Sequence, residues 1–310
     1  MKKSVSMSAV AAVAAGAAVS VGSNPALADQ MAGAEPEWFL SLEGGLVFAD
    51  PAFDKVGFTG SGITSDFDDF DKELGYRGAA KFGKKFNDNL DWRLGVAYSD
   101  FVKNHASSSF SGLGVESDSE FTTDLSYLTG DFEIGYNVRP SDRFDLRVFG
   151  GLRALNSSDS LDKFGEISIL GSGGTLGQDT DSEFLGIGPR VGVDFSGKLS
   201  DDSVLGFSGM LAAAVIIGDL KQKTETIAFS GGSSEPLFSD TNHTTETVFN
   251  LEAAFGADFH LTDNAVLTLG YRGEIVDRFS DKSGFLPSED SPAGSQFLSH
   301  GPFVRFISEF

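Results

Sequence analysis

The sequence contains no cysteine, only nine prolines among 310 residues, and 23 basic residues against 45 acidic ones. Without cysteine the chain cannot form disulfides, thiolate metal sites or a thiol nucleophile. The formal charge of −22 argues against a nucleic-acid partner, because the phosphates of such a partner would be repelled. Glycine and phenylalanine are instead abundant, at 38 and 29 residues, and together they indicate β-structure with aromatic side chains on an open face.

The N-terminus predicts export. Met1-Lys2-Lys3 forms a positive region, residues 9–21 are rich in Ala and Val, and Ala26-Leu27-Ala28 fits the small-x-small cleavage rule. Residues 1–28 are therefore predicted to be a signal peptide, followed by a short periplasmic segment at 29–36; an N-terminal anchor helix is the alternative. No later stretch approaches the roughly 18 to 20 apolar residues of a membrane helix. The exported chain is then either soluble or a barrel.

Ten segments of the mature chain alternate apolar and polar residues, with the apolar members on one parity within each segment. They cover residues 38–48, 76–82, 92–99, 128–137, 144–153, 185–195, 206–218, 249–260, 267–275 and 304–310. The apolar face is bulky and aromatic, whereas the other face carries Gly, Ser and charges, the inverse of a soluble protein. Because no backbone group can stay unpaired in hydrocarbon, this pattern predicts an all-β fold, a transmembrane antiparallel β-barrel of ten strands over residues 37–310. A secreted β-sandwich with shorter strands is the alternative.

The links between these segments alternate in length. Short polar links fall at residues 87–89, 140–142, 200–202 and 262–264, and long ones at about 50–74, 102–120, 156–182, 220–246 and 279–297. Short periplasmic turns and long extracellular loops are the expected asymmetry of a bacterial outer-membrane barrel, and an even strand count returns both termini to the periplasm. Within the long links, Ser107-Ser108-Ser109, Gly171-Ser172-Gly173-Gly174 and Gly231-Gly232-Ser233-Ser234 are interpreted as loop residues, and the first and last of these as flexible tips.

Aromatic residues gather on the apolar face at the strand ends next to the short links. Such a ring predicts the interfacial girdle of a membrane barrel, here formed by Trp38, Trp92, Tyr136, Phe144, Phe195, Phe259 and Phe310, with Phe86 and Phe207 beside them. A thinner upper ring contains Phe48, Tyr76, Tyr98 and Phe249. The terminal Phe310 also resembles the C-terminal signal read by the outer-membrane barrel assembly machinery. That machinery, outer-membrane lipid and lipopolysaccharide are therefore the expected partners of a multi-pass protein of the bacterial outer membrane.

Several strand segments carry a family resemblance. They are Trp38 to Phe48, Gly150-Gly151-Leu152-Arg153, Gly186-Ile187-Gly188-Pro189-Arg190-Val191-Gly192, Leu269-Gly270-Tyr271-Arg272 and His300-Gly301-Pro302-Phe303-Val304-Arg305. Together they resemble the major outer membrane protein family first known from Legionella, most specifically in the Gly-Pro-Arg and His-Gly-Pro-Phe pieces. The resemblance covers most of the mature chain and implies a porin-like, pore-forming barrel. Family members often carry Cys, so disulfide-linked assembly does not carry over to this chain.

Charges of both signs occupy the inward parity of the predicted strands. They are Arg77, Lys81, Arg93, Arg147, Arg153, Arg190, Arg272 and Arg305, with Glu43, Asp131, Glu133, Asp145, Asp194, Glu252, Asp258, Glu274 and Glu309. Isolated desolvated ions cost several kcal/mol each, so these side chains either pair and plug the lumen or line a thin wet path. Barrels of eight strands are filled and those of sixteen to eighteen leave wide channels, so ten strands alone favour a plug.

The family resemblance favours a pore instead. We therefore predict a narrow channel for passive diffusion of ions or small solutes, lined by these charged residues. The alternative is a non-conducting structural or adhesin-like surface-recognition barrel with a salt-bridged lumen. A homo-oligomer such as a trimer stays open, since no interface is readable from the sequence.

The remaining candidates for chemistry lie mostly in the long links. Asp66, Asp68, Asp69 and Asp71 are a candidate site for Ca²⁺ or Mg²⁺, but they lack the Gly and terminal Glu of a calcium-binding hand loop. A solvated acidic loop that enriches cations near the barrel mouth is therefore expected. No catalysis and no cofactor are expected, because no Gly-rich phosphate loop precedes a helix and no catalytic dyad assembles around the four histidines, His105, His243, His260 and His300.

Overall fold

The computed structural model describes residues 38–49, 64–67, 73–87, 89–102, 104–112, 115–141, 143–169, 172–200, 203–230, 233–277 and 296–310. The elements are β1 (Trp38–Ala49), β2 (Thr64–Phe67), β3 (Glu73–Lys85), β4 (Leu90–Phe101), β5 (Asn104–Gly112), β6 (Val115–Ser141), β7 (Phe144–Ile169), β8 (Ser172–Lys198), β9 (Leu205–Ser230), β10 (Ser233–Thr262), β11 (Ala265–Asp277) and β12 (Gln296–Glu309). Within these ranges, no helix is long and apolar enough to span a membrane. The predicted signal peptide, the 29–36 segment and Asp68, Asp69 and Asp71 lie outside the described residues.

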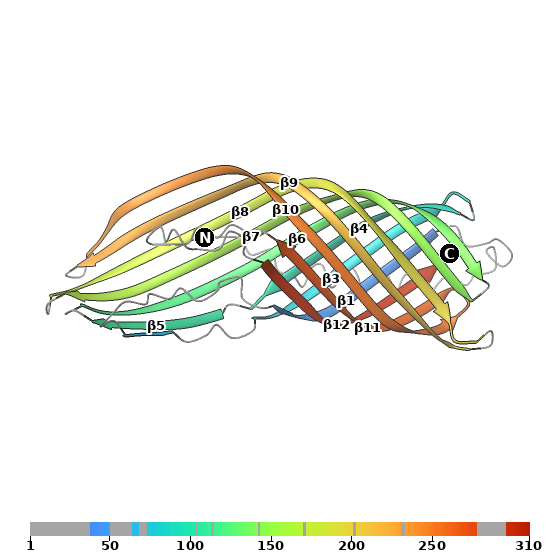
Figure 1. The fold of residues 1–310 in the computed structure, drawn as a ribbon, viewed down its shortest axis with the longest axis horizontal. Coiled ribbons are helices and arrows are strands. Elements are labelled where there is room, and N and C mark those ends of the chain that lie inside the picture. Colours follow the sequence, from blue (N-terminus) through green and yellow to red (C-terminus); the bar gives the residue numbers. More distant parts are fainter. Residues whose placement is uncertain are drawn as a thin grey trace.

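Ten of the strands close an antiparallel barrel (Figure 1). The ring runs β1, β3, β4, β6, β7, β8, β9, β10, β11, β12 and back to β1. It is closed by β1 and β12, where Glu43 lies opposite Arg305 and the backbones of Trp38 and Phe310 exchange two hydrogen bonds of 2.9 Å. Because a closed ring leaves no strand edge unpaired in hydrocarbon, the prediction of a ten-stranded membrane barrel is confirmed. The short strands β2 and β5 add to the sheet beside β6.

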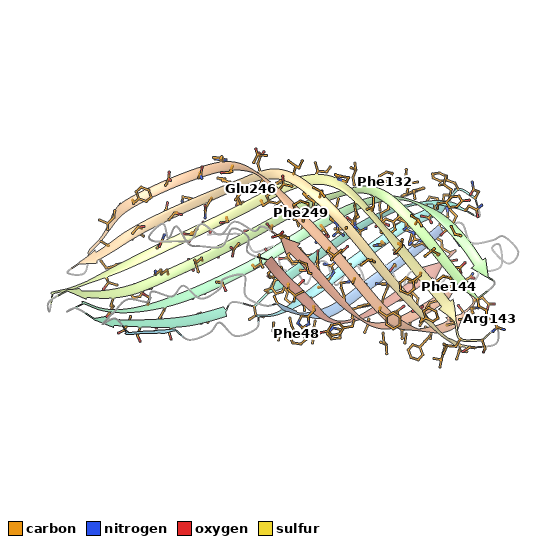
Figure 2. The ribbon with its side chains drawn as sticks, in the orientation of Figure 1. Phe48, Phe132, Arg143, Phe144, Glu246 and Phe249 are labelled. Carbon is orange, nitrogen blue, oxygen red and sulfur yellow. The ribbon has the colours of Figure 1, made fainter. Side chains whose placement is uncertain are left out.

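Side chains alternate between the lumen and the outer surface. In β9, Ala212, Ala214 and Ile216 are buried in the lumen, whereas Leu211 and Ile217 are 50% and 55% exposed. The same outward orientation is visible for Phe132, Phe144 and Phe249 in Figure 2. A protein surface of exposed Leu, Ile and Phe is stable only against lipid, so these outward side chains form the apolar band of the barrel.

The strands β6 to β10 are 26 to 30 residues long, against 12 to 14 for β1, β3, β4, β11 and β12. A strand needs about 9–11 residues to cross a bilayer, so the long strands continue well beyond it. Figure 1 shows this extension at the end opposite the short turns, past the ends of β11 and β12. The outward residues change there from apolar (Leu128, Leu185, Ile217 and Phe249) to polar (Ser126, Glu183, Asp219 and Thr247).

We call the extension the outer wall: β2, β5, and residues 115–126, 156–169, 172–183, 219–230 and 233–247. The prediction that residues 102–120, 156–182 and 220–246 form loops is therefore wrong, because most of them are paired strands. Ser107-Ser108-Ser109 lies within β5, and Ser172 to Gly174 within β8. The physical reason is that both faces of the outer wall lie outside the bilayer and carry Ser, Thr and acids, so the apolar alternation that reveals a half-buried strand is missing.

Candidate functional site: the lumen

A layer of ion pairs crosses the middle of the lumen. Arg153 donates to Asp131 at 2.7 Å and to Glu252 at 2.8 Å, and Arg190 donates to the same Glu252 carboxylate at 2.5 Å. Arg190 also donates to Glu133. None of these side chains except that of Asp131 is more than 2% exposed. Because β7, β8, β6 and β10 all contribute, this ion-pair layer ties opposite parts of the barrel wall together.

The ion-pair layer continues toward β3 and β11. Arg77 lies 3.4 Å from Glu274 and 3.6 Å from Glu252. The other acceptor positions of Glu274 are filled by the Tyr127 hydroxyl at 2.9 Å and the Asn250 amide at 2.8 Å. Both oxygens of the Glu274 carboxylate therefore accept hydrogen bonds from side chains of the barrel itself.

On the side where β1 and β12 close the barrel, the Glu43 carboxylate forms ion pairs with three arginines. It lies 3.0 Å from Arg272, 2.8 Å from Arg305 and 3.9 Å from Arg77. One carboxylate therefore faces three guanidinium groups from β3, β11 and β12. Cations locally outnumber the acid at this edge of the layer.

A second set of charges lies nearer the short turns. Arg147 donates to Asp91 at 2.7 Å, to Glu133 at 3.1 Å and to Asp194 at 2.9 Å. Arg93 donates to Asp194 at 3.2 Å. Other contacts in this region are looser or involve hydroxyls: Lys81 with Glu133 at 3.5 Å, Lys85 with Glu309 at 3.2 Å, and Asp258 with Ser208 and Thr268 at 2.8 and 2.6 Å.

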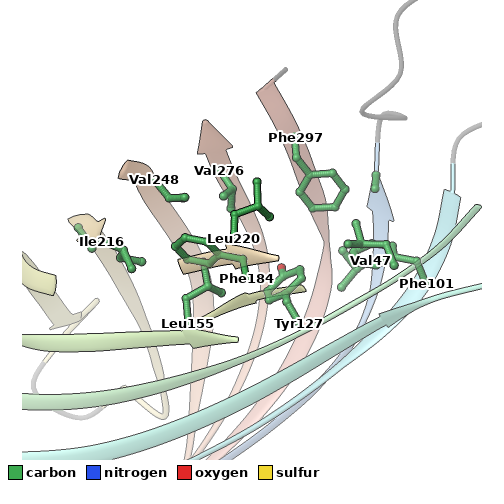
Figure 3. Packing of buried hydrophobic residues seen from close by; sticks show 13 residues of the cluster. Val47, Phe101, Tyr127, Leu155, Phe184, Ile216, Leu220, Val248, Val276 and Phe297 are labelled. Atoms are coloured by element: carbon green, nitrogen blue, oxygen red, sulfur yellow. The ribbon is translucent and has the colours of Figure 1, made fainter. Parts of the chain in front are cut away.

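An apolar layer lies above the ion pairs, toward the outer wall. Its side chains converge on the lumen from around the barrel in Figure 3: Val47, Ala49, Phe101, Leu125, Tyr127, Leu155, Phe184, Ala214, Ile216, Leu220, Val248, Val276 and Phe297. The Phe297 ring meets Phe101 edge to face with centroids 5.4 Å apart, and Tyr127 at 6.3 Å. Such close aromatic packing leaves little room for water or ions between the rings.

A cavity of about 280 Å³ occupies the lumen between the ion-pair layer and the short turns. Its lining includes Phe39, Lys81, Lys85, Arg93, Asp145, Arg147, Asp194, Arg305 and Glu309, all in or next to the turn-side half of the strands, and the ion-pair layer forms its closed end. We call this cavity the periplasmic vestibule. Along the barrel axis the lumen thus has a cavity at one end, ion pairs in the middle and apolar side chains above.

All fourteen residues predicted to line a pore lie on the inward face, in a single connected network. They are Glu43, Arg77, Lys81, Arg93, Asp131, Glu133, Arg147, Arg153, Arg190, Asp194, Glu252, Arg272, Glu274 and Arg305. Their role in conduction stays a prediction, because the contacts show only that these side chains pair with one another. The sequence interpretation missed the apolar layer. The sequence did contain a signal for this layer. Val248 and Val276 lie two residues beyond the inward residues Asn250 and Glu274, on the same face of their strands.

The predicted girdle residues lie at the turn-side ends of the strands. Trp38 stacks on Phe82 with centroids 5.1 Å apart and meets Trp92 edge to face at 6.2 Å, while Lys84 sits 4.8 Å above the Trp38 ring. Phe144 packs near Phe207 at 6.4 Å. Tyr136 is exposed, and Phe195, Phe259 and Phe310 are partly exposed. This arrangement suits a ring at the level of the lipid headgroups.

Among the residues that the structure describes, the other candidates do not come together in a site. Asp66 lies in β2, and in the described part of the chain no group of three His, Asp or Glu residues is placed to hold a metal. Among the histidines, His105 Nδ1 lies 2.9 Å from the Thr122 hydroxyl, and His300 Nδ1 lies 2.5 Å from the Tyr271 hydroxyl. The His300 ring also stacks on Tyr271 and lies 6.1 Å from the Phe48 ring, centroid to centroid. It therefore adds to the upper set of aromatic side chains that includes Phe48.

A closed antiparallel barrel with an apolar outer band and a charged lumen defines an outer-membrane β-barrel protein. The chain belongs to the family described as the Legionella pneumophila major outer membrane protein precursor, whose model matches residues 48–305. No curated protein sequence matches the chain.

Solved structures of outer-membrane barrels resemble it in fold. The outer membrane protease OmpT from Escherichia coli has a TM-score of 0.51 at 10% identity, over 88% of this chain and 97% of that chain. Neisserial surface protein A gives 0.29 at 10% identity over 88% and 97%, and the attachment invasion locus protein Ail of Yersinia pestis gives 0.22 at 12% identity over 87% and 99%. Only the first is similar enough to support an argument, and it supports the barrel fold alone.

Proposed function

We propose that this protein is a non-conducting barrel of the bacterial outer membrane that holds the outer wall above the lipid surface for recognition of other molecules. The observation that carries the proposal is the filled lumen. Two successive layers, one of ion pairs and one of apolar side chains, lie across the path that a solute would take. In each layer the central side chains, such as Arg190, Glu252, Ile216 and Phe297, are 2% exposed or less.

Energetics support a lumen that stays closed. Opening the ion-pair layer requires Arg153 and Arg190 to leave Glu252, and an uncompensated buried charge costs about 3–5 kcal/mol. That cost alone keeps the open state below about one molecule in a hundred. The apolar layer must move as well, so the open population falls further.

The outer wall supports a role in recognition. Its strands place polar side chains far above the apolar band, many of them acidic, among them Asp162, Asp179, Asp181, Glu183 and Glu225. Lys223 is paired with Glu225 at 2.6 Å, and that hydrogen bond raises the pKa of the lysine. A mostly acidic sheet face suits basic or cation-bridged partners at the cell surface.

The environment of the barrel follows from the same features. Outer-membrane lipid and lipopolysaccharide would surround the apolar band, and the barrel assembly machinery would read the terminal Phe310, which pairs with Trp38 at the closing seam. Passive diffusion of small ions is the second candidate function. The observation that favours it is the periplasmic vestibule, a cavity of polar and charged lining that already opens part of the lumen.

The proposed recognition role of the outer wall is tested by shortening one of its hairpins. Asp159 pairs with Ser182, so residues 160–181 can be replaced by Asn-Gly, which favours a tight two-residue turn. We expect the shortened barrel to fold with an unchanged heat-modifiable shift on a gel. Cells that display it should lose attachment to surfaces that retain cells with the full chain. Equal attachment by both would contradict a recognition role for this hairpin. Conductance of the refolded protein in a planar bilayer distinguishes the diffusion function.

A further inference from the structure

The periplasmic vestibule is lined by more hydrogen-bond donors than its acids satisfy. Among the described residues, six buried side-chain atoms have no hydrogen-bond partner: the guanidinium Nε atoms of Arg77, Arg93, Arg190 and Arg272, the Thr129 hydroxyl oxygen and one acceptor, Glu43 Oε1. Arg93 Nε lies 3.3 Å from Asp91 Oδ1, without the geometry of a hydrogen bond. All four arginines line the vestibule. Arg77 and Arg190 are more than nine-tenths buried, so their Nε donors without a partner are also shielded from bulk solvent.

The placement of charges adds to this donor surplus. Glu43 is shared by three arginines, and the closest acid to the Lys81 ammonium is Glu133, at 3.5 Å, which is too long for a strong hydrogen bond. Lys81 is 27% exposed and lines the vestibule. Seven acids line the same space, and each already interacts with a partner: Glu43, Asp91, Asp131, Asp145, Asp194, Glu252 and Glu309.

The volume of the vestibule limits what it can hold. About 280 Å³ corresponds to roughly nine water molecules at liquid density, enough for a small anion with its remaining hydration shell. An acceptor-rich anion such as a carboxylate or phosphate would satisfy several of the free donors at once, through charge-assisted hydrogen bonds.

We propose that the periplasmic vestibule is a binding site for a small carboxylate- or phosphate-bearing anion, which enters from the periplasmic side and binds Lys81 and the arginine donors of the ion-pair layer. The site does not depend on whether the lumen conducts, because it lies below both closing layers. It also does not depend on the outer wall. If no anion binds to the vestibule, the proposed recognition function is unaffected. If the outer wall has no role in recognition, the anion site is likewise unaffected.

The test is calorimetric titration of the refolded full chain in detergent micelles with inorganic phosphate, in a buffer of low chloride. We expect one saturable site in the wild type and at least a tenfold weaker one in Lys81→Gln. The matched control is Lys223→Gln, which removes one lysine charge from the outer wall and should change the affinity less than twofold. No saturable binding by the wild type, or equal weakening in both variants, would overturn the proposal.

A second measurement covers the case in which Lys81→Gln does not fold. Amine acylation of the wild type, read by mass spectrometry, reports the accessibility of each lysine with and without phosphate. We expect phosphate to slow the labelling of Lys81 several-fold while Lys223 stays unchanged. Labelling of Lys81 at the same rate with and without phosphate would contradict the site.

Discussion

Arg190 on β8 and Glu252 on β10 meet in the centre of the lumen with 2.5 Å between Nη2 and Oε2, across the intervening strand β9. The same carboxylate accepts from Arg153 and lies within 4 Å of Arg77 and Arg272. Glu252 is therefore the shared counter-charge of four arginines. The stability of the barrel and the closure of its lumen depend on the same group.

Replacing Glu252 by Ala should destabilise the folded barrel by about 3–5 kcal/mol, because several buried guanidinium groups lose a common partner. The measurement is urea unfolding in lipid vesicles, followed by the fluorescence of Trp38 and Trp92. The control is the double variant Glu252→Leu with Arg190→Met, which replaces the pair by apolar groups and should recover part of the loss. A cost below about 1 kcal/mol for the single variant would show that the ion pairs do not hold the lumen.

The apolar layer gives a separate stability prediction. Phe297→Ala should cost about 3–5 kcal/mol, because it leaves a cavity between Phe101 and Tyr127 that the rigid barrel wall cannot close. Phe249→Ala is the matched control, since Phe249 is 51% exposed on the outer surface and its loss leaves no internal cavity. Equal losses for the two variants in the same unfolding assay would mean that the layer is not packed.

Alanine substitutions at two adjacent glycines of β7 should differ sharply in their effect on stability. A Cβ added at Gly151 would collide with the Phe132 carbonyl of β6, whereas one added at Gly150 would meet nothing within 4 Å. We expect Gly151→Ala to lose about 1–3 kcal/mol through strain and Gly150→Ala to leave stability nearly unchanged. If the two variants unfold at the same urea concentration, the close approach of β6 and β7 at this point is wrong.

The upper edge of the apolar band can be located along β10. Leu251→Arg places a charge on the lipid-facing surface and should cost about 2–4 kcal/mol near the bilayer midplane, or less nearer its edge. Thr241→Arg, ten residues earlier on the outer wall, should stay within about 0.5 kcal/mol of the wild type because that position faces water. A similar cost at Thr241 would place the lipid boundary higher than the change from Phe249 to Thr247 indicates.

Alternation was enough to predict the membrane part of this fold from the sequence. Strands such as Trp38–Ala49 face lipid on one side and a charged lumen on the other, so the parity of Leu40 and Glu43 identifies both faces. The outer wall escaped the same analysis because residues such as Thr224 and Glu225 face polar surroundings on both sides. Its strands continue the pairing of the membrane strands without a break, and a period-two hydrophobic pattern does not reveal such a continuation.

The inward direction of Arg153, Arg190 and Glu252 was also predictable, but their partners were not. Which guanidinium reaches which carboxylate depends on barrel radius and strand stagger, and these are properties of the closed ring and not of any one strand. The apolar layer depends in addition on Phe101 and Phe184, which lie just outside the predicted strand segments, and on Phe297, which falls within the predicted 279–297 link but belongs to β12. The prediction of a channel rested on the family resemblance and was made without knowledge of that layer.

Conductance of the refolded protein in a planar bilayer, under a salt gradient, tests the central claim most directly. The filled lumen predicts a silent membrane from a sample whose heat-modifiable shift proves that the barrel is folded. Discrete conductance steps from the wild type would contradict the closed lumen and favour the diffusion function. Steps that appear only after Phe297→Ala is combined with Glu252→Ala would agree with closure by both layers.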